Sequence, residues 1–407
     1  MGRRPSKSLA QPTAAEGSCY LAAERKKTQR WRPFSCSGAS GRSAAWVGSA
    51  LLAGLLACHP PLPSPSTRIH LAPAPGSGAE LPCAWFGDSD GGVLYFGVSA
   101  FWSALRATGG DATADLAASG PRWIGRFDLA SERFLPPLEL RPGGAATGVW
   151  DVLVHPNGRV YFTTYFDFAG SVDPESGAVR EFASAGLGLN ELALGPAGQI
   201  LVTRYGFADD DEGSLVVLSE SGEILAEHVL AASPNLRVLA KSLAFDPLRR
   251  EAWLNTDLLP PGGGAALHDA RVLDAAGHER RRISDPELQF FAFTADGTGL
   301  FAEVSERRLR LRQRSPEGRD RFIALDDAFD PTYDFVQDMR AAPDGSVVLT
   351  RWSGRIHLVE KDGEVRDLSL PRTEAGELYY TATRAFGHVC ATRCGRVEVV
   401  CQDLPDS

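Results

Sequence analysis

Three carboxylates and one amide stand at equivalent places in a repeated pattern, and together they could bind a divalent cation. Asp151, Glu191 and Asp338 each lie seven residues before a turn glycine, and Asn190 directly precedes Glu191. Carboxylate and amide oxygens are the hard ligands that Ca²⁺ prefers. If the repeats bring these side chains together, the sequence predicts a Ca²⁺ site held by all four.

Other polar and aromatic residues occupy the same or the adjacent position of the pattern. We expect them to surround the same place: Trp150, Lys241, Ser242, Gln337 and Tyr380. This set leaves a second interpretation open. The carboxylates could instead face water and Lys241 in a polar channel that holds no metal.

The element that must position these residues is a β-hairpin. Residues 151–165 alternate apolar and polar side chains, turn at Pro156-Asn157-Gly158, and alternate again, which is typical of two strands joined by a tight turn. The turn position recurs at spacings between 40 and 66 residues, at Gly92, Gly158, Gly198, Arg249, Gly297, Gly345 and Gly387. A period near 40–50 residues with about four strands per unit indicates a β-propeller. The candidate residues would then begin the strands that line its central channel.

The seven turn positions predict seven four-stranded antiparallel blades. Six blades is the alternative, because residues 79–98 match the pattern poorly. The last unit shows only three strands, near 377–385, 387–393 and 396–401. We expect residues 67–72 to supply the fourth and to close the ring, which removes the exposed strand edges of an open ring.

The first 57 residues have the composition of a leader. A basic segment, residues 1–43, precedes 14 uncharged, mostly apolar residues, 44–57. This stretch is shorter than the ~20 residues of a membrane-spanning helix and fits a signal peptide. Residues 58–79 are rich in proline and predict an extended tether, followed by the propeller in 80–407.

Leu55-Leu56-Ala57-Cys58 resembles the lipobox of bacterial lipoproteins. The resemblance implies that Cys58 is acylated and anchors the protein to a membrane of the cell envelope. His59 follows, where aspartate would favour retention at the inner membrane, so the expectation is the outer membrane or the periplasmic side. The alternative is an alanine- and leucine-rich helix with an incidental cysteine.

The charge of the chain excludes one class of partner. Nine of the 42 Lys and Arg residues and two of the 51 Asp and Glu residues precede Cys58, so the remainder has a net charge of −16. Nucleic-acid binding depends on Lys and Arg contacts to phosphates. We therefore expect no nucleic-acid partner.

Four cysteines remain after Cys58, and an even number in an exported domain predicts two disulfides. These are Cys83, Cys390, Cys394 and Cys401, for which three connectivities are possible. We favour Cys390 with Cys401 and Cys83 with Cys394. If Cys394-Gly395 forms a two-residue hairpin loop, Cys390 lies opposite Val399 and Cys401 is its diagonal neighbour.

The repeat unit at residues 188–203 resembles the propeller repeats of the gluconolactonase-like and NHL/YVTN superfamily. Gluconolactonase-like enzymes use an Asn and an Asp at the heads of two inner strands as metal ligands, each followed by glycine. In this chain Glu191 follows Asn190, and Gln337 precedes Asp338. The resemblance implies a metal-dependent lactonase, with Asp338 or Glu191 as the base. We expect instead a non-catalytic propeller that binds a ligand or an envelope protein, and keep the lactonase as the alternative.

Overall fold

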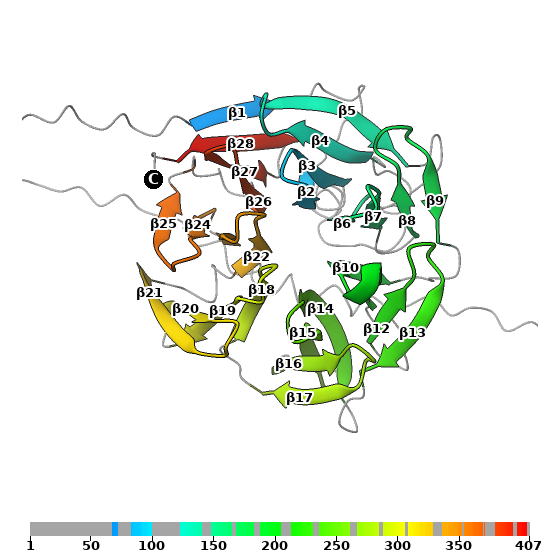
Figure 1. Cartoon of the computed structure of the whole chain (residues 1–407), viewed down its shortest axis with the longest axis vertical. Coiled ribbons are helices and arrows are strands. Elements are labelled where there is room, and N and C mark those ends of the chain that lie inside the picture. The colour runs from blue at the N-terminus through cyan, green and yellow to red at the C-terminus, as the bar shows by residue number, and fades with distance from the viewer. Residues whose placement is uncertain are drawn as a thin grey trace, which may run out of the picture.

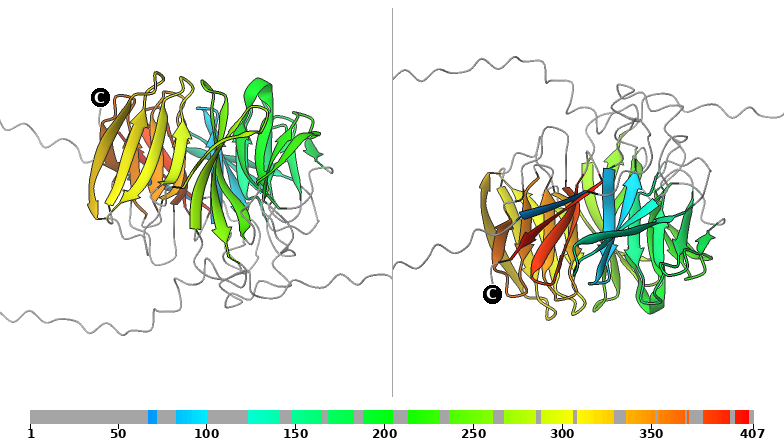
Figure 2. Two further views of the ribbon diagram at one scale, coloured as in Figure 1. Left: turned by 90° about the horizontal axis from the view of Figure 1, so that it is seen from below. Right: turned by 90° about the horizontal axis from the view of Figure 1, so that it is seen from above.

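The computed structural model describes residues 67–71, 83–99, 123–140, 148–164, 168–182, 188–204, 213–230, 236–260, 267–284, 288–305, 308–328, 336–351, 354–368, 370, 379–393 and 397–404. Seven four-stranded antiparallel sheets surround a central axis (Figure 1). The prediction of seven blades is confirmed. Figure 2 shows the ring from two sides.

Each of six blades consists of four consecutive strands, which follow one another from the channel outward. Blade 1 holds β2 (Cys83–Ser89), β3 (Val93–Ser99), β4 (Trp123–Asp128) and β5 (Arg133–Glu139); blade 2 holds β6 (Asp151–Val154), β7 (Val160–Thr163), β8 (Ala169–Val172) and β9 (Val179–Glu181); blade 3 holds β10 (Leu189–Leu194), β11 (Ile200–Arg204), β12 (Ser214–Leu218) and β13 (Ile224–Val229). The 3₁₀ turn η2 (Pro196–Gly198) joins β10 to β11.

The remaining blades follow the same order. Blade 4 holds β14 (Arg237–Asp246), β15 (Glu251–Leu259), β16 (Leu267–Asp274) and β17 (Glu279–Ile283); blade 5 holds β18 (Leu288–Phe293), β19 (Gly299–Ser305), β20 (Arg308–Arg314) and β21 (Asp320–Ala328); blade 6 holds β22 (Val336–Ala341), β23 (Val347–Arg351), β24 (Ile356–Val359) and β25 (Val365–Leu368); blade 7 holds β26 (Tyr379–Ala385), β27 (His388–Arg393), β28 (Glu398–Asp403) and, outermost, β1 (Thr67–Leu71).

The hairpin of residues 151–163 shows why the sequence folds this way. β6 and β7 pair from Asp151 with Thr163 to Val154 with Val160. Gly158 closes the turn by donating its N–H to the carbonyl of His155 at 2.9 Å, with a φ of 82° that favours glycine. The local pattern therefore fixes the register of the blade.

The hydrophobic core lies between neighbouring blades. One cluster joins Leu153 and Tyr161 of blade 2 to Ile200, Val202 and Val216 of blade 3, all buried. Each sheet packs both of its faces, which explains why inner strands contain runs of apolar residues as well as alternation. Burial of each such side chain contributes about 1.5–3 kcal/mol.

Blade 7 combines the end of the described chain with its start. β1 pairs antiparallel with β28, with Thr67 opposite Gln402 and Leu71 opposite Glu398 (Figure 1). The strand expected at 67–72 thus lies at the outer edge of this sheet. A side-chain contact also links β1 to blade 1: Arg68 bonds to Glu132 in the β4–β5 turn and, at 2.7 and 2.8 Å, to Asp403 at the end of β28 in its own sheet.

Replacing Arg68 by alanine should lower the free energy of unfolding by about 1 kcal/mol, a modest value because the guanidinium is one-third exposed and partly screened. The change removes the contacts that join β1 to Glu132 and Asp403. Urea denaturation checks the value, with Arg133→Ala as the matched control. Equal stability of the Arg68 variant and the wild type would contradict a stabilising role.

The disulfide between Cys390 and Cys401 is present, but the predicted register is wrong. The two cysteines lie directly opposite each other, with Cα atoms 4.1 Å apart. Arg393 pairs with Glu398, so four residues separate the strand ends instead of two. The longer connection moves Cys401 from the diagonal to the facing position. Cys394 and the side chain of Cys83 lie outside the described residues, so their pairing stays a prediction.

The predicted leader, Cys58 and most of the predicted tether also lie outside the described residues. Within the part of the chain that the structure describes, no helix is long and apolar enough to cross a membrane.

Candidate functional site

Irregular pairing marks the start of most inner strands. In β10 the register shifts between Leu189 and Leu192, so Asn190 and Glu191 lie on the irregularity. Equivalent shifts occur in β2, β14, β18, β22 and β26. A β-bulge redirects side chains and often lies next to a functional site. Asn190, Glu191 and Asp338 therefore lie at such shifts, whereas β6, which begins at Asp151, pairs regularly with β7.

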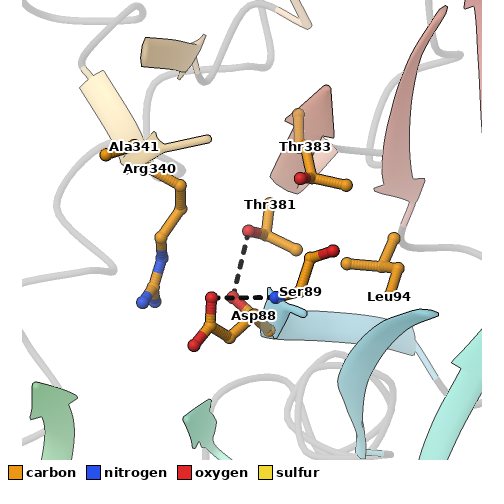
Figure 3. A pocket seen from close by; sticks show the side chains of 9 residues that line it. Asp88, Ser89, Leu94, Arg340, Ala341, Thr381 and Thr383 are labelled. Atoms are coloured by element: carbon orange, nitrogen blue, oxygen red, sulfur yellow. Dashed lines mark hydrogen bonds between the residues drawn. The ribbon is translucent and has the colours of Figure 1, made fainter. Parts of the chain in front are cut away.

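Arg340 on β22 lies among the carboxylates of the channel. Its Nη2 donates to Asp151 at 3.0 Å, and its Nε lies 3.1 Å from the nearer carboxylate oxygen of Asp338. Asp151 is completely buried, whereas one-fifth of the Arg340 side chain is exposed. Figure 3 shows the guanidinium extending toward Asp88 of β2. A protein cation thus already bonds two of the residues that were predicted to bind metal.

Two carboxylates of the channel also join successive blades. Asp88 accepts a hydrogen bond from the backbone N–H of Val154 at 2.9 Å, which links blade 1 to blade 2. Asp151 accepts one from Leu192 at 2.8 Å, which links blade 2 to blade 3. These contacts give Asp88 and Asp151 a structural role besides their charge.

Burial and like charge strongly alter the acidity of the group. Burial raises the pKa of Asp151 to about 6, although Arg340 opposes the shift. Burial, and then the charge of Asp151, raise the pKa of Glu191 well above its ordinary value. Burial likewise raises the pKa of Asp88. Burial disfavours the charge of Arg340, but the nearby Asp338 and Asp151 carboxylates raise its pKa overall, so it stays protonated.

Glu191 differs from the other carboxylates because its side chain has no bonded partner among the described residues. Asp88, Asp151 and Asp338 each accept at least one hydrogen bond. Glu191 is instead influenced by Arg340 only through the charge of the guanidinium. A carboxylate left unpaired in a partly buried site destabilises the fold and marks a position where a ligand could bind.

Replacing Glu191 by glutamine should raise the free energy of unfolding by about 1–3 kcal/mol at pH 8, since it removes an unsatisfied charge. The pKa of Glu191 is higher in the folded protein than in the unfolded chain, where it is about 4.3. As pH rises from the unfolded pKa through the folded pKa, the contribution of Glu191 to the free energy of unfolding is therefore lost. The advantage of the variant should therefore shrink as pH falls toward 4.

Chemical denaturation at pH 5 and pH 8 checks this prediction. Glu223→Gln, an exposed substitution on blade 3 with the same change of charge, is the control and should have little effect at either pH. A Glu191→Gln variant that is less stable than the wild type at pH 8 would contradict the assignment.

A cavity of about 270 Å³ opens beside these groups. Its polar lining includes Asp88, Glu191, Ser242, Asp338 and Arg340. The remaining part of its wall is apolar and includes Leu153, Leu194, Leu243, Phe245 and Phe290. The polar groups supply the larger part of its exposed surface, and convergent polar groups can fix the orientation of a small ligand. A second, much smaller space between β2, β22 and β26, of about 10 Å³, has room for about one water molecule (Figure 3).

Aromatic side chains from three inner-strand heads pack together at one side of the channel. The rings of Trp85 and Tyr380 stack at 4.4 Å, and Trp150 lies 5.3 Å from Trp85. Phe86 meets Tyr380 edge-on at 5.4 Å. Trp150 and Tyr380, which were predicted to surround the site, form part of this cluster and do not line the cavity. These two side chains instead contribute to the packing between blades 1, 2 and 7.

Two amide oxygens at the strand heads lack hydrogen-bond partners within the described structure. They are Oδ1 of Asn190, a residue only 5% exposed, and Oε1 of Gln337. Ser242 accepts a hydrogen bond from Asn255 at 3.0 Å. The side chain of Lys241 is outside the described set, so its predicted place stays untested.

The contacts in the channel do not favour the predicted Ca²⁺ site. The described residues contain two groups of three potential ligand atoms within 4.8 Å of one another, and both include Glu132, at the junction of blades 1 and 7. Neither contains Asp151, Asn190, Glu191 or Asp338. Arg340 supplies positive charge where the metal would supply it, and like charges repel. The Ca²⁺ assignment stays a prediction for metal analysis.

Sequence reasoning missed Arg340 and Asp88 because it considered only the first two residues of each inner strand. Arg340 lies two residues after Asp338, and side chains two apart on a strand share a face. The two-residue period of a strand therefore indicated that Arg340 shares a face with Asp338. The approach of Arg340 to Asp151, 189 positions away in the chain, depends on closure of the ring.

Solved structures with similar folds are β-propellers at low sequence identity. Virginiamycin B lyase from Staphylococcus aureus, a catalytically inactive form with quinupristin, has a TM-score of 0.53 and 12% identity; the match covers 84% of this chain and 100% of the lyase. An extracellular domain from B. thetaiotaomicron, described as part of a one-component system, has a TM-score of 0.51 and 9% identity, covering 80% of this chain and 40% of that one. The chain is a β-propeller.

YCF48 bound to a D1 peptide has a TM-score of 0.50 and 9% identity, and the match covers 84% of this chain and 97% of YCF48. Neither a protein-family model nor a curated sequence matches the chain. At these identities the structural matches establish the fold and leave function to be argued from the channel.

Proposed function

We propose that the protein is a non-catalytic binding module of the bacterial cell envelope, anchored through lipid on Cys58, that binds a small ligand in its channel cavity. The observation that carries the proposal is the cavity beside Glu191, a carboxylate without a bonded partner in the described structure. The cavity favours a small ligand over a protein partner because its polar groups lie inside the ring.

The lipobox-like segment and the signal-like stretch before it support the envelope location. An extracellular propeller domain among the structural matches agrees with it. The disulfide between Cys390 and Cys401 adds support, because disulfides persist in oxidising compartments.

Cys58→Ser should abolish incorporation of radiolabelled palmitate in a bacterial host and release the protein from the membrane fraction. The reason is that acylation requires the cysteine thiol. Cys19→Ser, which lies in the leader, is the control and should leave labelling and fractionation unchanged. Continued labelling of the Cys58 variant would contradict lipid attachment at this residue.

Ligand binding is tested by thermal unfolding of the purified chain in the presence of small-molecule fractions from the host envelope. A ligand at 100 times its Kd stabilises the folded state by about 2.7 kcal/mol, so an active fraction should raise the Tm measurably. Ser242→Trp places a large side chain in the cavity and should remove the response. If stabilising fractions act equally on this variant, the ligand binds elsewhere.

The alternative is the metal-dependent lactonase that the family resemblance implies. No contact among the described channel residues favours it, because Asp151 and Asp338 bond to Arg340. Turnover of a lactone and ester panel that a chelator abolishes would replace the binding module with this enzyme.

A further inference from the structure

The unsatisfied polar groups at the heads of β10 and β22 are all hydrogen-bond acceptors. Oδ1 of the buried Asn190 and Oε1 of Gln337 have no partner in the described structure, and the Glu191 carboxylate has none either. Asn190 and Glu191 share the irregular start of β10, and Gln337 occupies the same place in β22. Of these three residues only Glu191 lines the cavity, so a ligand there meets the Glu191 carboxylate and must be a hydrogen-bond donor.

The charge of the channel points the same way. Four carboxylates, Asp88, Asp151, Glu191 and Asp338, act on one guanidinium, that of Arg340. When all are ionised, three negative charges remain uncompensated within this group. Arg340 bonds to Asp151 and Asp338, which leaves Glu191 as a cavity-lining acid without a bonded cation in the described structure.

The smaller, apolar part of the cavity lining distinguishes an organic cation from a metal ion. Leu153, Leu194, Leu243, Phe245 and Phe290 line the cavity together with the charged groups. A bare Ca²⁺ ion needs six to eight oxygen ligands and gains nothing from such a wall. An alkyl or aryl group would remove this surface from water and gain free energy on binding.

We propose that the cavity binds a small organic cation with N–H donors, a primary alkylammonium or guanidinium compound, with its charged end at Glu191 and its apolar part against the Leu and Phe wall. The inference rests on the proposed function and names the ligand class of the same site. A donor cation would satisfy the Glu191 carboxylate and supply charge that Arg340 does not.

Isothermal titration of the purified full chain at pH 7 tests the proposal with three probes: n-butylammonium chloride, n-butanol and calcium chloride. We expect n-butylammonium to bind with 1:1 stoichiometry and n-butanol, which matches its shape without the charge, to bind at least roughly tenfold more weakly, as expected for loss of a charge-assisted hydrogen bond. Calcium chloride should not displace n-butylammonium from the cavity.

Glu191→Gln should weaken n-butylammonium binding at least roughly tenfold, whereas Glu223→Gln, an exposed control with the same change of charge, should leave it unchanged. Binding should release protons, because the cation favours the ionised form of Glu191. The measured enthalpy should then vary with the ionisation enthalpy of the buffer. Circular dichroism confirms that both variants are folded.

Each other outcome overturns the inference in a recognisable way. Equal binding of n-butanol would mean that the cavity takes apolar molecules, so the binding function would stand without the cation. Stoichiometric calcium binding that excludes n-butylammonium would restore the metal site. Binding of none of the probes would remove the cation class, and failure of the envelope fractions in the thermal assay would remove the proposed function separately.

Discussion

Replacing Arg340 by methionine should lower the free energy of unfolding by about 3–5 kcal/mol at pH 7, the largest effect of any substitution that we predict. Methionine keeps much of the side-chain volume but leaves Asp151 buried without its ion pair, and Asp338 loses the same partner. Removal of one member of a buried pair costs more than removal of both, because the remaining charge is unsatisfied. Urea denaturation measures the change.

A triple variant provides the control. Arg340→Met combined with Asp151→Asn and Asp338→Asn removes the charges together and should recover much of the lost stability. The single variant should also become more stable as pH falls, since without Arg340 the burial of Asp151 favours its protonated form even more strongly. If the Arg340→Met variant is as stable as the wild type at pH 7, Arg340 does not stabilise the channel carboxylates.

Reduction of the Cys390–Cys401 disulfide should lower the free energy of unfolding by about 3 kcal/mol. The bond closes a loop between residues 11 positions apart, and in the chain-entropy account a loop of this size contributes roughly that amount. It joins β27 to β28, the strand that pairs with β1, so its loss also weakens the outer part of blade 7. Urea denaturation with and without reductant checks the value.

Cys390→Ala combined with Cys401→Val is the matched variant, with both residues in a fully buried position. It should unfold at lower urea than the oxidised wild type. Any remaining sensitivity of this variant to reductant would report on the predicted Cys83–Cys394 bond. No effect of reductant on the wild type would contradict a stabilising disulfide.

The repeat could be predicted from the sequence because blade formation is local. Alternation along 151–165 and glycine at its turn define one hairpin, and the spacing of the turns defines the ring. The same period located Asp151, Glu191 and Asp338 at the strand heads. These predictions need only the two-residue period of a strand and the chemistry of tight turns.

What the sequence could not provide depends on distances between blades. Arg340 neutralises a carboxylate of blade 2 from blade 6, and no local pattern indicates which of many arginines does so. The predicted register of Cys390 and Cys401 was wrong for a different reason, within one blade: it rested on an assumed loop length, and a difference of two residues moved the pairing. The approach of blade 6 to blade 2 therefore explains why a protein cation, Arg340, lies beside the predicted metal ligands.

Native mass spectrometry of the purified, non-denatured chain is the most direct test of a ligand site in the channel. We predict a bound small molecule, or a saturable 1:1 adduct after addition of an active envelope fraction, that the Ser242→Trp variant does not retain. Ser242 lines the cavity, so a tryptophan there should occupy the space that the ligand needs. Identical adducts on the wild type and on a folded Ser242→Trp variant would contradict the account, because they would place the ligand outside the channel.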